Sequence, residues 1–82
     1  MVEVFYESLF EKRIKRIRDE LLKIKVRKQI SKIIQNPEIG KPMRYSRKDT
    51  REVYVSPLRL SYLYTKSENK ILFLDLYHKD HQ

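Results

Sequence analysis

The feature that most constrains this fold is a single change in hydrophobic period, at the segment N-P-E-I-G-K-P (36–42). Before that segment, apolar residues recur at intervals of three and four, the spacing that gives a helix one apolar face. After it, apolar and polar residues alternate over 51–55, 58–65 and 71–77, which is typical of strands with one buried face. The segment holds the only glycine, Gly40, and two prolines, so it predicts the junction between a helical half and a sheet half.

Two amphipathic helices are predicted ahead of the junction. One apolar stripe is followed by a second in a different register: Phe10, Ile14, Ile17 and Leu21, then Leu22, Val26, Ile30, Ile33 and Ile34. The break near Asp19 favours a helical hairpin, with Asp19 as N-cap of the second helix, over one continuous helix. Ser8 and Glu11 have the spacing of a capping box at the start of the first helix.

The strands complete an α+β fold in one domain that spans residues 1–82. The segment V-E-V-F-Y (2–6) predicts a first strand ahead of the helices, and 43–45 is a candidate for a short additional strand. The predicted order is β-α-α-β-β-β. We expect the helical hairpin on one face of an antiparallel sheet of about four strands.

Charge indicates the class of partner. Lys and Arg number 19 against 11 Asp and Glu, which gives a net charge of +8. Such a field attracts nucleic acid, acidic proteins or anionic membranes, although a soluble domain can also be basic without any such partner. The N-terminus does not read as a signal peptide, and no apolar run is long enough to cross a membrane. We therefore expect a soluble protein of the cytoplasm that does not use a membrane.

The same composition predicts no cofactor. The chain has no cysteine, only two histidines, and no glycine-rich loop that could cradle a phosphate. Its carboxylates lack the spacing of metal ligands, so a metal site is not expected.

Arg59 is the first candidate site residue, because it stands among leucines and tyrosines in the predicted strand 58–65. Side chains alternate across a strand, so Leu58, Leu60 and Tyr62 should face the helices and Arg59 the uncovered side. An arginine there either pairs across strands with Glu52 or Asp75, or binds an external anion.

Further side chains that could take part in catalysis are expected at the same end of the sheet. The last strand should deliver Tyr77, His78 and Lys79 close to Arg59, and the strand 51–55 should bring Glu52. A histidine can protonate a leaving oxygen near neutral pH, and an arginine can stabilise charge on a phosphoryl group. The alternative is that His78 and His81 are solvated residues of the chain end and that the tyrosines only pack the sheet.

Three stretches, in this order of elements, resemble the RelE/ParE superfamily of toxins from toxin–antitoxin pairs, and specifically its RelE branch. They are N-P-E-I-G-K-P at 36–42, L-R-L-S-Y at 58–62 and L-D-L-Y-H-K at 74–79. The resemblance implies a metal-independent endoribonuclease that cuts mRNA in the ribosomal A site, by attack of a 2′-OH on the adjacent phosphate. It also implies a cognate acidic antitoxin, similar to RelB, that blocks the toxin.

The resemblance also suggests roles for individual residues. Arg59 would stabilise the transition state, Lys79 would be the basic residue after the last strand, and His78 would be the general acid. The general base stays open, with Glu52 a candidate by its chemistry. RNA would be contacted by basic residues of the helices and of the segment before the strand 51–55: Lys12, Lys15, Lys28, Arg44, Arg47, Lys48 and Arg51.

Two other functions remain open from the sequence. One is a toxin of the ParE branch, which binds DNA gyrase without cutting RNA. The other is a basic nucleic-acid-binding module without toxicity.

Overall fold

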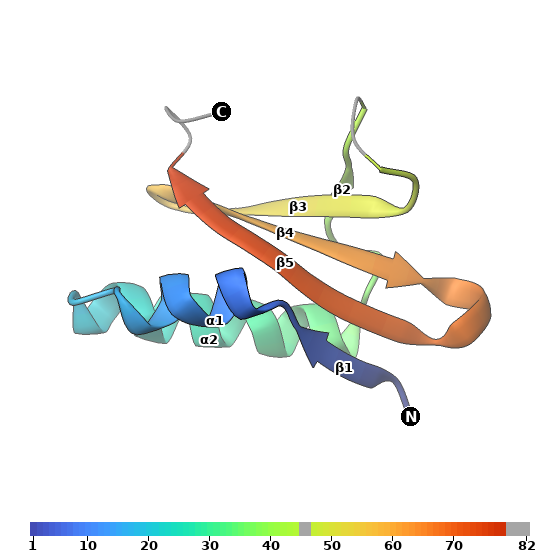
Figure 1. Cartoon of the computed structure of the whole chain (residues 1–82), viewed down its shortest axis with the longest axis horizontal. Helices are drawn as coiled ribbons and strands as arrows, with labels where there is room; N and C mark the ends of the chain where they lie inside the picture. The colour runs from blue at the N-terminus through green and yellow to red at the C-terminus, as the bar shows by residue number, and fades with distance from the viewer. Residues whose placement is uncertain (45–46, 79–82) are drawn as a thin grey trace.

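The computed structural model describes residues 1–44 and 47–78. Its elements are β1 (Glu3–Tyr6), α1 (Ser8–Lys15), α2 (Glu20–Gln35), β2 (Lys41–Pro42), β3 (Thr50–Val55), β4 (Leu58–Thr65), the short 3-10 helix η1 (Lys66–Glu68) and β5 (Lys70–His78). Figure 1 shows both helices on one side of the sheet, as the change in period predicts. The α+β class is thereby confirmed, and among the described residues no helix is long and apolar enough to span a membrane.

The sheet has five strands in the order β1-β5-β4-β3-β2, which is one more than predicted. β1 pairs with β5 in parallel, so the sheet is mixed and the prediction of a wholly antiparallel sheet is wrong. The reason is topological: the chain leaves β1 through the helices and re-enters the sheet from the far edge, which brings β5 back alongside β1 (Figure 1). The additional strand β2 lies at Lys41–Pro42, just before the predicted 43–45.

The helical hairpin is confirmed, but only one of its two predicted caps is. The Asp19 carboxylate accepts hydrogen bonds from the backbone N–H groups of Leu21 and Leu22, as an N-cap does. Ser8 is already the first helical residue, and Glu7 occupies the N-cap without a side-chain hydrogen bond. The α1 start is therefore set by the extended backbone of Glu7, and the predicted Ser8 cap is wrong.

The core lies between the helices and the sheet face that they cover. Leu58, Leu60 and Tyr62 of β4 are all buried, whereas Arg59 between them is half-buried, so the predicted alternation is confirmed. The helices and the remaining strands add the other buried hydrophobic residues of the core: Phe10, Val26, Ile33, Val55, Ile71, Phe73 and Leu76. The rings of Phe10 and Phe73 stack with centroids 5.3 Å apart.

One tyrosine ties the junction segment to the sheet. The Tyr62 hydroxyl accepts a hydrogen bond from the Gly40 N–H (2.8 Å) and donates one to the Pro37 carbonyl (2.7 Å). Arg51 adds bonds from Nη1 to the carbonyls of Glu38 and Gly40. A Cβ on Gly40 would lie 2.5 Å from the Tyr62 hydroxyl, so only glycine fits. We call Pro37, Gly40, Arg51 and Tyr62 the Tyr62 anchor.

Candidate functional site

Arg59 lies on the sheet face that the helices leave uncovered, beside Glu52 and Tyr54, and Glu52 links it to Tyr77. Its Nη1 is 2.6 Å from Glu52 Oε1, and the other Glu52 oxygen accepts a hydrogen bond from the Tyr77 hydroxyl at 2.9 Å. The Arg59 guanidinium carbon stands 5.9 Å from the centre of the Tyr54 ring. These four residues, Glu52, Tyr54, Arg59 and Tyr77, form the Arg59 cluster.

Strand register brings the cluster together. Arg59 is directly opposite Tyr54 on β3 and Tyr77 on β5, and residues opposed in antiparallel strands share a face. Glu52 is two residues from Tyr54 and therefore lies on that face too. Of the two cross-strand partners considered for Arg59, the structure selects Glu52, because Asp75 pairs instead with Arg13 of α1.

The cluster leaves hydrogen-bonding capacity unused. The Arg59 side chain is 30% exposed and that of Glu52 is 18% exposed, so the pair is partly shielded from water. Within the described residues, Arg59 Nε is a buried donor without a hydrogen-bond acceptor. Such atoms are rare in folded proteins, and each one requires an explanation. A ligand acceptor that reaches Nε would supply it.

A bulge near the middle of β5 decides which end residues reach this face. The pairing advances from Tyr62↔Phe73 to Ser61↔Asp75, so Leu74 is an extra residue. Beyond it Tyr77 shares the face of Arg59, whereas His78 is opposite Leu58 on the helix-covered face. The structure therefore does not bring His78 to Arg59 as we expected from the sequence, and Lys79 lies outside the described residues.

The sequence analysis expected Tyr77, His78 and Lys79 near Arg59, but it gave the proton-donor role to His78 and none to Tyr77. The apolar spacing of the last strand does not show the exchange of faces, because residues 71–74 are all apolar. It appears in the burial: Ile71 and Phe73 are two apart, but the next buried residue, Leu76, is three further on. A three-residue step in a strand indicates a bulge, after which the two faces are exchanged.

The residues expected to contact RNA divide into two groups. Six of them have exposed side chains: Lys12, Lys15, Lys28, Arg44, Arg47 and Lys48. Arg51 instead belongs to the Tyr62 anchor, where both of its hydrogen bonds go to backbone carbonyls. Its position is explained by the fold without any RNA.

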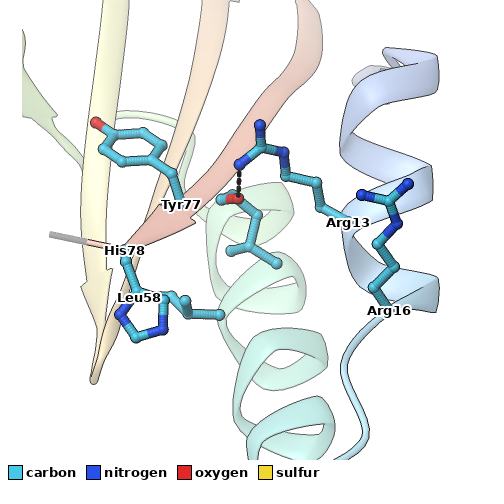
Figure 2. A pocket seen from close by; sticks show the side chains of 6 residues that line it. Arg13, Arg16, Leu58, Tyr77 and His78 are labelled. Atoms are coloured by element: carbon cyan, nitrogen blue, oxygen red, sulfur yellow. Dashed lines mark hydrogen bonds between the residues drawn. The ribbon is translucent and has the colours of Figure 1, made fainter. Parts of the chain in front are cut away.

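A groove opens on the other face of the sheet, between α1 and the adjoining ends of β4 and β5. It has a volume of about 320 Å³ and is lined by Arg13, Arg16, Leu58, Leu76, Tyr77 and His78. In Figure 2, His78 lies beside Leu58, and the Tyr77 ring extends away from them. The groove and the Arg59 cluster therefore meet at Tyr77, which belongs to both.

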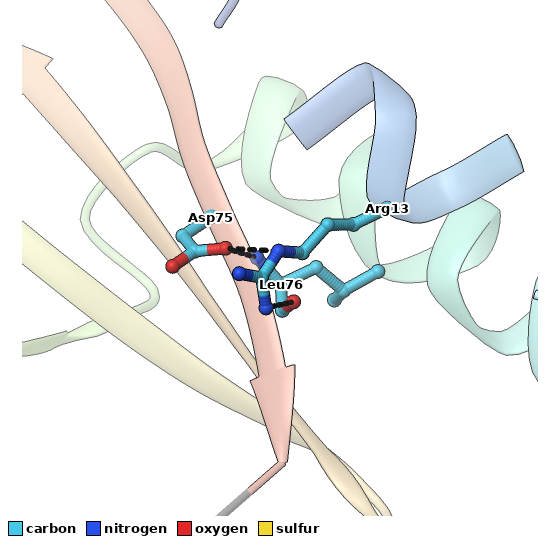
Figure 3. A network of polar contacts seen from close by, with 3 residues as sticks. All are labelled: Arg13, Asp75 and Leu76. Atoms are coloured by element: carbon cyan, nitrogen blue, oxygen red, sulfur yellow. Dashed lines mark hydrogen bonds and ion pairs between the residues drawn. The ribbon is translucent and has the colours of Figure 1, made fainter. Parts of the chain in front are cut away.

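Arg13 and Asp75 close the edge of β5 next to this groove. β1 pairs only as far as Phe73, so the following residues of β5 have no strand on that side. Arg13 Nη1 donates to the Leu76 carbonyl (3.3 Å), Asp75 accepts from the Leu76 N–H (2.7 Å), and Arg13 Nε is 3.3 Å from Asp75 (Figure 3). Two side chains therefore replace a partner strand at Leu76.

No group of three or more potential metal ligands occurs among the described residues. The polar chemistry of the Arg59 cluster is that of one guanidinium, one carboxylate and two phenol hydroxyls. Such groups can bind an anion and move protons.

Comparison with known proteins agrees with this architecture. Residues 4–82 match the family model described as ParE toxin of type II toxin–antitoxin system, parDE. No curated protein matches the sequence significantly.

Solved structures of toxins share the fold over nearly the whole chain. One match is a chain of the E. coli RelBE toxin–antitoxin complex, at 11% sequence identity and a TM-score of 0.79. The alignment covers 95% of this chain and 96% of the matched chain. A chain of the E. coli DinJ–YafQ complex matches at 19% sequence identity and a TM-score of 0.81, over 99% of this chain and 97% of the matched chain. A metal-bound toxin from Helicobacter pylori matches at 22% sequence identity and a TM-score of 0.73, over 99% of this chain and 98% of the matched chain. At these identities the likeness establishes the fold alone.

Proposed function

Because the chain belongs to the ParE toxin family of type II toxin–antitoxin systems, within the RelE/ParE superfamily, we propose a specific activity for it: ribosome-dependent cleavage of mRNA. The protein acts in the cytoplasm as a metal-independent endoribonuclease in the ribosomal A site, and a cognate acidic antitoxin restrains it. The observation that carries the proposal is the buried Arg59 Nε on an uncovered sheet face, a donor that has no acceptor within 1–44 and 47–78. An RNA phosphate supplies that acceptor.

The Arg59 cluster has groups for each proton transfer. As the 2′-oxygen bonds to phosphorus, its proton passes to the Glu52 carboxylate, while Arg59 stabilises the charge that grows on the phosphoryl oxygens. The bond from phosphorus to the 5′-oxygen then breaks, and that oxygen takes the hydroxyl proton of Tyr77. The products are a 2′,3′-cyclic phosphate and a 5′-OH end. Tyr77 recovers its proton from Glu52, to which it is hydrogen-bonded at 2.9 Å.

This assignment gives Tyr77 the role that the resemblance suggested for His78. Tyr77 contacts Glu52 directly, whereas His78 stands opposite Leu58 on the other face. The phosphate must also compete with Glu52 for the Arg59 guanidinium, because the two side chains are paired when no RNA is bound. Glu52 is therefore expected both to accept the proton and to limit RNA affinity.

A second candidate function rests on that same ion pair. The carboxylate of Glu52 neutralises Arg59 at 2.6 Å, which is the arrangement of a structural pair. A toxin of the ParE type, which acts on DNA gyrase and cuts no RNA, needs no free arginine. Under this alternative the Arg59 cluster only stabilises the sheet.

A cleavage assay separates the two functions. A defined mRNA is incubated with the protein, with and without ribosomes, and the ends are mapped by primer extension and tested for a cyclic phosphate. We expect cuts only with ribosomes, and a loss of at least about 100-fold in Arg59→Ala. Arg27→Ala is the matched control, because Arg27 is an exposed arginine of α2 outside the cluster.

Two results would contradict the proposal. One is equal cleavage by the wild type and Arg59→Ala. The other is no cleavage together with inhibition of gyrase supercoiling, which would assign the protein to the ParE type.

A further inference from the structure

A row of side chains crosses the uncovered face of the sheet next to the Arg59 cluster and shares no residue with it. Strand register aligns Phe5 of β1 with Leu72 of β5. Leu72 in turn lies opposite Leu63 of β4, and Leu63 lies opposite Thr50 of β3. Because neighbouring strands are about 4.8 Å apart, the row is roughly 14 Å long. We call these four residues the Phe5–Thr50 row.

The row faces away from the helices. Leu72 stands between Ile71 and Phe73, which are both 0% exposed, and it is itself only partly buried. Side chains alternate across a strand, so Leu72 lies on the uncovered face, and the register places Leu63 and Phe5 there with it. Phe5 is the most open member, at 47% exposure. The row therefore offers apolar surface to a ligand.

Cations flank the row at both ends. Lys70 Nζ stands 6.0 Å from the centre of the Phe5 ring, and its ion pair with Glu68 is exposed and therefore weak. At the other end, the Thr50 N–H donates to the Arg47 carbonyl (3.1 Å), which holds an exposed arginine beside the row. Single-stranded nucleic acid matches this composition, because its bases present flat faces that stack on apolar side chains and its phosphates are anions.

The same face holds two buried polar atoms that lack a hydrogen-bond partner in the part of the chain that the structure describes: Arg59 Nε and Thr50 Oγ1. Thr50 is 3% exposed and lies opposite Leu63 at the end of the row. A phosphate on Arg59 leaves the threonine hydroxyl unsatisfied. The edges of RNA bases carry N–H groups and carbonyl oxygens, so a base that covers Leu63 can bond to this hydroxyl.

We propose that the Phe5–Thr50 row binds bases of the RNA strand whose phosphate Arg59 holds, with an unstacked base on Leu63 and Leu72 and its polar edge toward the Thr50 hydroxyl. Leu63 is four residues from Arg59 along β4, about 13 Å between the two Cα atoms. The Arg59 side chain extends toward the row, because it pairs with Glu52. This inference rests on the proposed function, since it takes RNA as the substrate.

An RNA that cannot be cut tests the row without catalysis. The probe is a short single-stranded RNA with 2′-O-methyl groups, which lacks the attacking hydroxyl, and its counterpart carries abasic sugars on the same backbone. Affinity is measured by fluorescence anisotropy at low salt, and contact by the methyl shifts of leucines in the full chain. We expect shifts at Leu63 and Leu72, and about tenfold weaker binding of the abasic strand.

Matched variants separate the row from general attraction to a basic protein. Phe5→Ala should weaken the RNA about fivefold and leave the abasic strand unchanged. Leu9→Ala is the control, because Leu9 is 45% exposed but belongs to α1 on the other side of the sheet, and it should change the affinity by less than about twofold. Thr50→Val keeps the side-chain shape and removes the hydroxyl, so it should weaken the RNA about fivefold without lowering the Tm.

Four outcomes would overturn the proposal. They are equal affinities for the RNA and the abasic strand, leucine methyl shifts that leave Leu63 and Leu72 unmoved, equal weakening by Phe5→Ala and Leu9→Ala, and a capped leucine-rich peptide that binds the row when the RNA does not. The last would assign the row to a protein partner. RNA that binds the row while unmodified mRNA is never cut would instead contradict only the proposed cleavage.

Discussion

The Tyr62 anchor and the Arg59 cluster are built on the same two strands, yet they differ in how completely their polar groups are satisfied. In the anchor, a buried hydroxyl both accepts and donates, and Arg51 gives its bonds to two backbone carbonyls. In the cluster, a partly exposed ion pair leaves the Arg59 Nε without an acceptor among the residues that the structure describes. The difference indicates that one face of β3 and β4 is optimised for stability, whereas the other retains capacity for a ligand.

The burial of each group determines how much free energy of unfolding its substitution should cost. A buried polar group that loses its partner costs the full penalty of desolvation, whereas an exposed ion pair is weakened by water and salt. Substitutions in the anchor should therefore reduce the free energy of unfolding more than substitutions in the cluster. The following predictions run from the largest effect to the smallest.

Gly40→Ala should have the largest effect, a loss of about 3 kcal/mol in the free energy of unfolding. The new Cβ would stand 2.5 Å from the Tyr62 hydroxyl and 2.8 Å from a ring carbon, so either the junction segment or the ring must move. Urea denaturation measures the loss, with Ser31→Ala on the exposed surface of α2 as control. A loss below about 0.5 kcal/mol would show that the contact is not tight.

Tyr62→Phe should cost about 2 kcal/mol, because the Gly40 N–H and the Pro37 carbonyl both lose their partner. The ring itself is kept, so packing is nearly unchanged. Thermal unfolding of the variant should show a lower Tm with the same cooperativity. An unchanged Tm would mean that water replaces the hydroxyl at no cost.

The anchor should also be sensitive to alkaline pH. Burial raises the pKa of Tyr62 above its ordinary value of 10.0, although the hydrogen bond from Gly40 and the charge of Arg51 act in the opposite direction. The unfolded chain therefore loses this proton first, so the stability that Tyr62 contributes is complete below pH 10 and falls as pH rises above it. Unfolding free energies at several alkaline pH values should fall more steeply for the wild type than for Tyr62→Phe. Parallel curves would contradict the assignment.

The Arg59 cluster should give the smallest effect on stability. A double-mutant cycle with Arg59→Ala and Glu52→Gln is expected to yield a coupling energy of about 1 kcal/mol or less, because both side chains are partly exposed. Each single variant should keep its fold, as judged by circular dichroism. A coupling energy that equals the cost of Tyr62→Phe would remove the contrast between the two faces.

The sequence was sufficient for the parts of this architecture that depend on local pattern. Alternation along β4 placed Arg59 on the uncovered face, and the break at Asp19 predicted the hairpin, since both signals depend only on residues near in sequence. The parallel pairing of β1 with β5 could not be inferred in the same way, because it depends on the path of the whole chain.

The candidate site was predicted only in part. Glu52 was considered as a cross-strand partner of Arg59, and the ion pair between them confirms the contact. The bulge at Leu74 exchanges the faces of Tyr77 and His78, and its effect is decided by pairing with β4 rather than by β5 alone. Both Tyr77 and His78 were expected near Arg59, and the structure brings only Tyr77 to its face.

The most direct test of this account is inhibition of cell-free translation from a purified mRNA, where gyrase has no role. The wild type should stop translation. Arg59→Ala should leave translation intact although it stays folded at the assay temperature. Tyr62→Phe should inhibit as the wild type does at temperatures where it stays folded. Inhibition by Arg59→Ala equal to that of the wild type would contradict the claim that the uncovered face carries the function.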